Sequence, residues 1–457
     1  MTARPIGSRA TGMDGGGVVR RAASASKEGR NEALCALLAE LGWSVSGFAQ
    51  RVRERCQAIG TPRSVSPSTV LRWCDGAVPG PELVGPACLV LSVALRRRVP
   101  PERLGWPAES ADFAADALQY GDLQHAVRVL PKLWQLDSVP GRAAVRRMSV
   151  GGNFAPALHQ ALVMLPDAEL AGQGRQRVSV ADVELLELHT DLYGRLDARH
   201  GGGRFRSVFA AFLDLHATPL LHGAFSARRG RRLYGSVADA VLALANMAHD
   251  DQVPGLAQRY DLQAMRLAQA VGDRGRLARG YIHQARLAAA RGERADVLTH
   301  ARSAVFASDG APPLVRAYAA VTEARAWALN GSPDQTQAAV GRARDAFNRA
   351  NAGTGPRWLL WLDRPELEGQ AAWALAMAGL VVPGAAALQA ALDMPEERTR
   401  DNVELLITGA ELARLQGDDA ERAALMKRAV EASRHLKSRR LADRLARATE
   451  GQPLHDF

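Results

Sequence analysis

Aromatic residues are scarce in this chain of 457 residues, at 5% of the sequence, whereas alanine is very abundant. A large β-sheet would need more aromatic and β-branched residues than the chain offers, which argues against all-β and Rossmann-type folds. Alanine has the highest helix propensity. We therefore expect an all-α protein, and its 47% of hydrophobic residues is enough to bury the cores of two or three domains.

Cysteines are also few. Cys35, Cys56, Cys74 and Cys88 form no CxxC pair, which argues against a zinc site. We expect them to be small buried hydrophobic residues in a reducing compartment. Residues 1–30 lack the apolar run of a signal peptide and are interpreted as a disordered arm.

One long stretch without charge, Gly369 to Leu392, has the length of a membrane span. It is rich in alanine and contains Pro383-Gly384 in its middle, so a turn between two buried helices fits it better. We expect a soluble, cytoplasmic protein without a membrane partner.

Motifs for catalysis or nucleotide binding are missing from the sequence. It contains no GxxxxGK[ST] loop, no HExxH pair and no GxSxG. Gly201-Gly202-Gly203-Arg204 is interpreted as a turn that connects two helices. We therefore expect neither an enzyme nor a metal ion or other cofactor.

Positive charge is concentrated near the N-terminus. Residues 1–110 contain 15 of the 58 Lys and Arg residues but 9 of the 48 Asp and Glu residues, which is +6 of the net charge of +10. Nearly all of these cations are arginine, since the whole chain has only four lysines. This concentration favours a polyanionic partner for the segment.

Four helices are expected in this basic region, over residues 31–41, 44–59, 66–75 and 82–95. The third begins with Ser66-Pro67, a helix-capping serine followed by a proline at the first helical position, and Gly76 ends it. Helical spacing places two groups of side chains on opposite faces of this helix. Val70, Trp73 and Cys74 face inward, and Ser66, Ser68, Thr69 and Arg72 remain free.

The second helix of a helix-turn-helix unit has the same buried face and free face, because its outer residues enter the major groove of DNA. We predict that bases or phosphates are contacted by Ser66, Ser68, Thr69 and Arg72, and flanking phosphates by Arg51, Arg53, Arg55 and Arg63. The alternative is a four-helix domain whose arginines are only solvated. The connector from Gly60 to Val65 favours this alternative, since it is longer than the usual turn of 3–4 residues.

An internal repeat is visible in the C-terminal half. Four glycines each end a helix and are followed twelve residues later by an alanine. The pairs are Gly292 with Ala304, Gly331 with Ala343, Gly379 with Ala391, and Gly417 with Ala429. A turn glycine with a small residue in the next helix is typical of tetratricopeptide-like helix pairs. We predict an α-solenoid with an elongated concave groove.

These patterns divide the chain into five parts. They are a disordered arm at 1–30, a helix-turn-helix-like domain at 31–107, a helical connector with linkers at 108–178, a solenoid at 179–450 and a tail at 451–457.

Both halves of the chain resemble one family. The N-terminal match consists of NEALCALLAELGWSVSGFAQRV (Asn31 to Val52) and SPSTVLRWCDGAVPGPE (Ser66 to Glu82), which resemble the divergent XRE-type helix-turn-helix of actinobacterial regulators. The C-terminal match consists of LDARHGGGRFR (Leu196 to Arg206) and LAQRYDLQAMRLAQAVGD (Leu256 to Asp273), which resemble the tetratricopeptide-like half of the same proteins. The resemblance covers roughly residues 31–107 and 180–450. It implies a transcriptional regulator whose recognition helix is Ser66–Asp75, with Ser68, Thr69 and Arg72 as contacts.

We therefore expect a DNA-binding regulator whose solenoid senses a ligand or docks a protein partner. Occupancy of the groove would change the spacing of two N-terminal domains in a homodimer, and with it the affinity for DNA. One alternative is a scaffold that binds no DNA and sequesters another regulator. A second alternative is a peptide-sensing quorum regulator, whose groove would hold a peptide backbone through Asn246, Arg279, Gln284 and Arg325.

Overall fold

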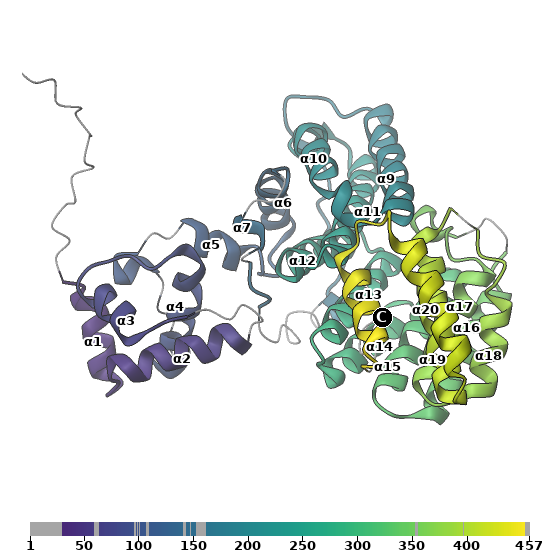
Figure 1. Ribbon diagram of the computed structural model, residues 1–457. Coiled ribbons are helices and arrows are strands. Elements are labelled where there is room, and N and C mark those ends of the chain that lie inside the picture. The colour runs from purple at the N-terminus through teal and green to yellow at the C-terminus, as the bar shows by residue number, and fades with distance from the viewer. Residues whose placement is uncertain are drawn as a thin grey trace, which may run out of the picture.

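The computed structural model describes residues 30–58, 64–95, 97, 99, 101–106, 109–139, 143–146, 148–151, 161–351, 355–395 and 397–452. The described chain is all-α apart from one pair of two-residue strands, as the composition predicts (Figure 1). Its elements are α1 (Glu32–Glu40), α2 (Val45–Ala58), α3 (Pro67–Cys74), α4 (Pro81–Leu95), η1 (Pro101–Leu104), α5 (Glu109–Asp116), α6 (Leu123–Asp137), α7 (Ala143–Arg146), β1 (Gly172–Gln173), α9 (Val180–His200), η2 (Gly202–Arg204), α10 (Arg206–Leu221), β2 (Ala224–Phe225), α11 (Ala227–Asp250), α12 (Pro254–Ala270), α13 (Arg274–Ala290), α14 (Arg294–Ala307), α15 (Pro313–Leu329), α16 (Pro333–Asn348), η3 (Arg357–Leu359), α17 (Arg364–Met377), α18 (Val381–Ala390), α19 (Thr399–Gln416), α20 (Asp419–Ser433) and α21 (Arg439–Thr449).

The N-terminal domain contains the four expected helices, α1 to α4, around a core of its own. Local sequence sets the ends of α3, because the Ser66 side chain accepts a hydrogen bond from the Thr69 N–H and Gly76 follows the helix with φ +100°. The predicted inner face of α3 is confirmed, since Val70, Trp73 and Cys74 are all buried. The expected disordered arm lies outside the described residues.

The predicted repeat is confirmed by the helix pairs of the C-terminal half. α13 packs along α14, α15 along α16, α17 along α18, and α19 along α20. The four turn glycines all have φ between +69° and +74°, a backbone conformation that strains any residue with a Cβ. The four alanines that follow them are 0–1% exposed, as expected of small residues buried in helix packing.

The position of one turn differs from the prediction. The uncharged stretch does fold as two helices, α17 and α18, but the turn falls at Ala378–Leu380 rather than at Pro383-Gly384. Pro383 lies in the first turn of α18, where a residue needs no N–H donor for the helix. In the sequence alone, a proline can mark either the first turn of a helix or the turn that follows a helix, so Pro383 did not settle where the turn lies.

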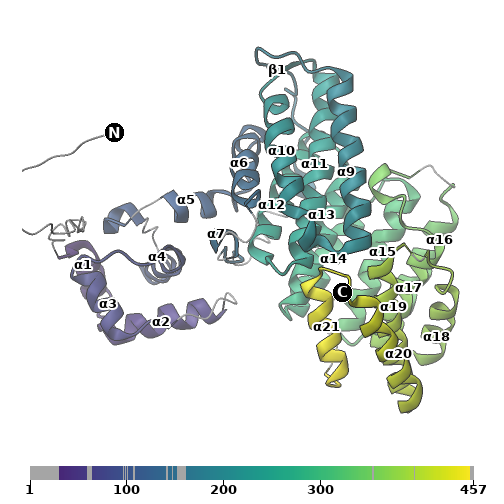
Figure 2. The same cartoon turned by 45° about the horizontal axis from the view of Figure 1, so that its top comes forward.

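The helix pairs curve until the two ends of the array meet. α9 packs against both α11 and α19, and α21 packs against α11, α19 and α20. Figure 2 shows the long helix α9 running beside α11, with α21 next to the repeat helices. The predicted concave groove is therefore bordered on one side by α9.

No single helix of the described residues is long and apolar enough to cross a membrane. The consecutive helices α1 and α2, which are bent by 90° at their break, reach the required length and apolar content only when they are taken together.

Candidate functional site

The helix array surrounds a partly open cavity of about 1050 Å³. Its wall is built by the first helix of each pair, α11, α13, α15, α17 and α19, together with α9, the segment around η3 and Arg440 of α21. None of the second helices, α12, α14, α16, α18 and α20, contributes a described residue to the wall. The cavity is therefore the inner surface of the solenoid.

The turn between α9 and α10 closes the array. The Gly203 N–H donates to the Lys437 carbonyl at 3.1 Å, and the Lys437 N–H donates to the His200 carbonyl at 2.8 Å. The Gly202 N–H donates to Asp250 at 2.8 Å, while the Ser438 hydroxyl donates to the other oxygen of the same carboxylate at 2.6 Å. A Cβ at Gly202 would lie 2.6 Å from the backbone of α11, so only glycine fits there. The expected interpretation of this stretch as a helix connection is confirmed.

Most carboxylates of the cavity wall are held by arginine. Asp239 accepts two hydrogen bonds from Arg276, at 3.0 and 2.7 Å. Glu404 accepts one from Arg444 at 2.7 Å and another from Arg440. Burial alone would raise the pKa of Glu404, but Arg440 and Arg444 hold it well below its usual range.

A second paired carboxylate joins α9 to α19. Asp197 lies 3.0 Å from the Arg400 guanidinium and accepts a hydrogen bond from Asn246 at 3.0 Å. Burial raises the pKa of Asp197, although Arg400 counteracts it. Because Arg400 and Asp197 come from opposite ends of the array, this contact also fastens its closure.

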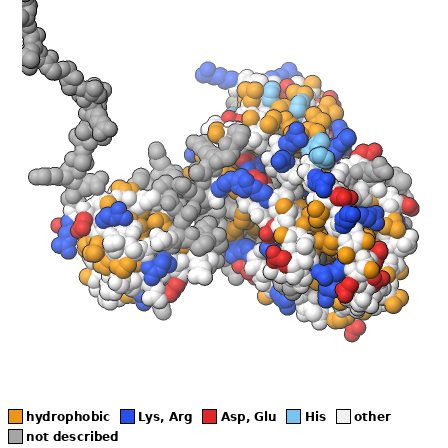
Figure 3. All heavy atoms as spheres, in the orientation of Figure 1, with side chains coloured by type: hydrophobic (Ala, Val, Ile, Leu, Met, Phe, Trp, Pro, Cys, Tyr) orange, Lys and Arg blue, Asp and Glu red, His pale blue; other side chains and the backbone are white. Residues whose placement is uncertain are grey.

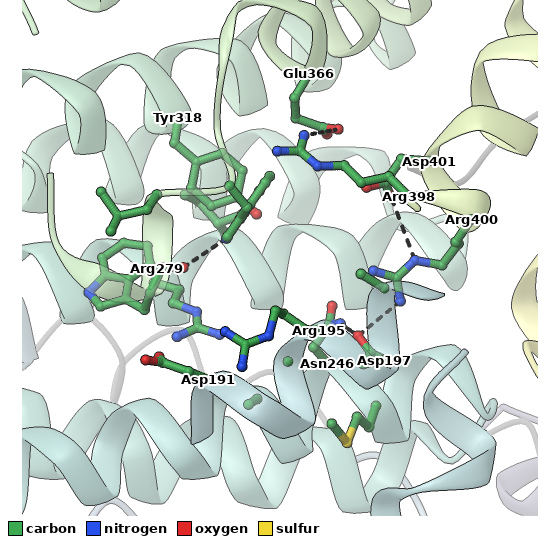
Figure 4. A pocket seen from close by; sticks show the side chains of 18 of the residues that line it. Asp191, Arg195, Asp197, Asn246, Arg279, Tyr318, Glu366, Arg398, Arg400 and Asp401 are labelled. Atoms are coloured by element: carbon green, nitrogen blue, oxygen red, sulfur yellow. Dashed lines mark hydrogen bonds and ion pairs between the residues drawn. The ribbon is translucent and has the colours of Figure 1, made fainter. Parts of the chain in front are cut away.

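Some arginines of the wall have no carboxylate at hydrogen-bond distance within the described chain. Arg195 and Arg199 lie one turn apart on α9, and Arg279 lies on α13. The carboxylate nearest to Arg279 is that of Asp239, at 3.9 Å, and Arg276 already holds that group. In Figure 4 the side chains of Arg195 and Arg279 both point into the cavity. Burial lowers the pKa of Arg279.

Aromatic side chains form the wall next to this arginine cluster, which we define as Arg195, Arg199 and Arg279. Trp358 stacks on Arg279, whose guanidinium carbon is 5.1 Å from the ring centroid. Tyr318 meets Trp361 edge to face, with ring centroids 5.3 Å apart. The indole N–H of Trp361 donates to the Trp358 carbonyl at 2.7 Å, which fixes its ring at the rim.

Glu366 is a titratable group on the far side of the cavity. Burial and, to a lesser extent, the charge of nearby Asp401 raise its pKa to about 8, because two carboxylates disfavour each other's charge. Gln370 donates a hydrogen bond to Glu366 at 2.8 Å, and Arg398 lies 3.8 Å from the same carboxyl group. Glu366 therefore carries its proton near neutral pH and adds little negative charge to the wall.

The structure places the predicted DNA-contacting residues of α3 on one accessible side of the N-terminal domain. Ser68 and Arg72 are exposed, and Thr69 is half-buried. Ser66 is occupied as the helix cap, and its hydroxyl also lies 2.7 Å from that of Ser68 and 2.9 Å from that of Thr69.

The arginines predicted to hold flanking phosphates differ in their contacts and in their exposure to solvent. Arg51 donates to the Gly47 carbonyl at 2.9 Å and stacks on Trp43, and Arg53 donates to the Val65 carbonyl. Arg55 is half-buried, and Arg63 lies outside the described residues. On the face of the N-terminal domain shown in Figure 3, basic side chains are scattered among apolar ones and form no continuous patch.

Three of the four residues named for peptide binding, Asn246, Arg279 and Arg325, line the cavity, and Gln284 does not. Gln284 donates instead to buried Asp261 at 3.0 Å. The Asn246 amide is occupied at both ends, because it donates to Asp197 and accepts from Arg286 at 2.7 Å.

Sequence reasoning missed the contribution of α9 and the aromatic wall. Trp358 and Trp361 stand three residues apart in a sequence with few aromatic residues, and this is a signal that could have been used. Arg195 precedes the quoted glycine turn by six residues, but nothing local indicates that it faces α13.

No three His, Cys, Asp or Glu side chains of the described chain are arranged to hold a metal ion. The four cysteines form no disulfide, and all except half-buried Cys35 are buried, as expected.

Comparison with known proteins gives one partial match. The family model described as the SP15 N-terminal domain matches residues 34–107, which correspond to the N-terminal domain and to no part of the helix array. No curated protein and no solved structure matches the chain significantly.

Proposed function

We propose that this protein is a ligand-sensing DNA-binding regulator, a binding protein rather than an enzyme. The observation that carries the proposal is the large, partly open cavity inside the helix array, lined with charged and aromatic side chains. Its volume of about 1050 Å³ is at the upper end of small-molecule sites, which usually measure ~300–1000 Å³. A helix array that served only as a scaffold would not need to close around such a space.

The DNA-binding part of the proposal is supported by α3. This helix is short, capped at its N-terminus and exposed along Ser68, Leu71 and Arg72, the positions that enter the major groove in a helix-turn-helix. The excess of positive charge in residues 1–110 adds a general attraction for phosphates. The resemblance to XRE-type regulators agrees with this assignment.

A physical connection between the two parts runs through α5 and α12. The Arg259 guanidinium donates to the Ala114 carbonyl at 2.9 Å, and the Gln263 amide donates to the Ala117 carbonyl at 2.9 Å. α5 also packs against α4 of the N-terminal domain, and α12 packs against α13, which lines the cavity. A ligand that shifts α13 therefore acts on the helix that carries the N-terminal domain.

The proposal includes a cytoplasmic homodimer, because two linked N-terminal domains read two half-sites. An apolar surface on α9 and α10 supports self-association. Its residues Leu188, Leu192, Val208 and Leu215 are 43–69% exposed, and Figure 3 shows hydrophobic side chains gathered over these helices.

Selection from a random-sequence duplex library at near-physiological salt tests the DNA-binding part. The full-length protein should enrich a short, two-fold-related site, and Arg72→Ala should abolish the enrichment because it removes an exposed cation from α3. Arg302→Ala, which removes an exposed arginine from α14, is the matched control and should leave the enrichment unchanged.

Recovery without sequence preference, lost on modest addition of salt, would overturn this part of the proposal, since it reports phosphate attraction alone. The scattered basic side chains and the local bonds of Arg51 and Arg53 favour a second candidate in that case. It is a scaffold that sequesters another regulator.

A further inference from the structure

The cavity carries more positive than negative charge. Ten arginines line it against eight Asp and Glu residues. The carboxylates that would have to bind a cationic ligand are already engaged, for example Asp239 with Arg276 and Asp191 with Arg357. A cation would have to break these pairs, whereas an anion would not.

The arginine cluster is where the excess charge lies. Arg279 is only 13% exposed at its side chain and has no hydrogen-bonded carboxylate, and the side chain of Arg195 points into the same cavity (Figure 4). A buried guanidinium without a hydrogen-bonded carboxylate is a costly charge, and an anion beside Arg279 would offset that cost. Such an anion would accept the planar, bidentate hydrogen bonds that arginine donates best.

The surroundings of the arginine cluster favour a ligand with a flat apolar body. Trp358, Trp361 and Tyr318 present ring surfaces to the cavity beside Arg279. Trp361 is 37% exposed and Leu360 is 51% exposed, so both offer accessible apolar surface at the cavity. Aromatic rings would stack on these surfaces while the anionic group reaches the arginines.

We propose that the cavity binds an aromatic organic anion, with its carboxylate, phosphate or sulfonate group between Arg195 and Arg279 and its apolar body against Trp358, Trp361 and Tyr318. This assignment rests on the proposed ligand-sensing role of the cavity and specifies the class of ligand. It does not depend on DNA binding by the N-terminal domain.

Fluorescence titration with 1-anilinonaphthalene-8-sulfonate, a naphthalene that carries a sulfonate, tests the proposal directly. The full-length protein should bind it at one saturable site. Arg195→Gln and Arg279→Gln should each weaken binding on the order of tenfold, which is what one charge-assisted hydrogen-bonded contact contributes. Arg302→Gln on α14 is the matched control and should leave the affinity unchanged.

A neutral dye separates the anionic contact from the apolar one. Nile red should bind the two arginine variants as well as it binds the unaltered protein, whereas Trp361→Ala should weaken both dyes. Arg195 is exposed, so Arg195→Gln keeps the test valid if Arg279→Gln does not fold. Equal anilinonaphthalene sulfonate affinity in all arginine variants, or an equal loss of Nile red, would overturn the proposal.

Competition then identifies the anionic group. Displacement of the dye by phenyl phosphate but not by indole-3-acetate assigns a phosphate ligand, the reverse assigns a carboxylate, and displacement by neither contradicts a general anion site. The library selection is read separately, so a failure of DNA binding leaves this result intact.

Discussion

Arg206 shows how strongly a single buried charge is fixed in this protein. It is 8% exposed and donates to Asp137 and, at 3.1 Å, to Asp251. The Tyr260 hydroxyl donates to the second oxygen of Asp137 at 3.1 Å. The network joins α6, α10, α12 and the end of α11, and no member can be removed without leaving another buried and charged.

Arg206→Met should therefore lower the free energy of unfolding by about 3–5 kcal/mol, the cost of leaving a buried ion pair without one partner. Urea denaturation followed by circular dichroism measures this loss. Arg302→Met, which removes an exposed arginine, should change stability by less than ~0.5 kcal/mol. A loss for Arg206→Met as small as that of the control would contradict the role given to the network.

Glu366 predicts a pH dependence of stability. Its pKa is about 8 in the folded protein against an ordinary value of 4.5. Between these two values the unfolded chain has released this proton and the folded chain has not, so the free energy of unfolding falls as pH rises through this range. Below the lower value both states hold the proton, and the penalty vanishes.

Glu366→Gln removes the titrating group and keeps the shape. The variant should gain more in melting temperature over the unaltered protein at pH 8 than at pH 5. Differential scanning calorimetry at the two pH values provides the comparison, with exposed Glu421→Gln treated in the same way to check for general effects of charge. Equal gains at both pH values would show that Glu366 is ionised throughout.

The effect of a glycine on the stability of a helix depends on its backbone conformation. Gly417 ends α19 in the left-handed region at φ +74°, and Gly341 lies inside α16 with ordinary helical geometry. An added Cβ would meet nothing within 4 Å at either position, so packing does not distinguish the two glycines.

Opposite effects of the same substitution should follow. Gly417→Ala should destabilise the protein by about 1 kcal/mol because alanine is strained in the left-handed region. Gly341→Ala should stabilise it by about 0.5–1 kcal/mol because alanine favours the helix. Chemical denaturation of the two variants side by side measures the contrast, and the same sign of change in both would disprove the argument.

The sequence was most informative about the individual helices and the turns between them. The glycine and alanine pairs predicted the helix pairs correctly because each signal lies within one turn and the helix that follows it. The turn predicted at Pro383-Gly384 was misplaced. Proline is compatible with both the start and the end of a helix, and nothing in the local sequence decides between them.

The cavity could not be predicted, because contacts distant in sequence create it. Asp197 and Arg400 are 203 residues apart in sequence, and the hydrogen-bonded residues Gly203 and Lys437 are separated by even more of the chain. Hydrophobic periodicity identifies which face of α9 or α13 is buried, but not which other helix it meets. Arg195 therefore looked like an ordinary surface residue, as it would on most solvated helices.

The apolar surface on α9 and α10 leads to a prediction for the whole molecule. If this surface joins two copies, light scattering at micromolar concentration should give the mass of a dimer, and the double variant Leu188→Glu, Leu215→Glu should give that of a monomer. Val382→Glu on α18 replaces an equally exposed apolar residue, at 81%, and should leave the mass unchanged. A monomeric mass for the unaltered protein, with and without DNA, would count against the dimer.

The closure of the helix array has a consequence for co-translational folding. Helices α9 to α19 can pair as they emerge, but the hydrogen bonds of Lys437 and Ser438 and the contact of Arg440 with Glu404 form only after the last helix has been synthesised. The contacts that close the ring of helices around the cavity therefore form in the final steps of translation. Under the proposed function, a chain that ends before these contacts would lose ligand binding while it keeps most of its helices.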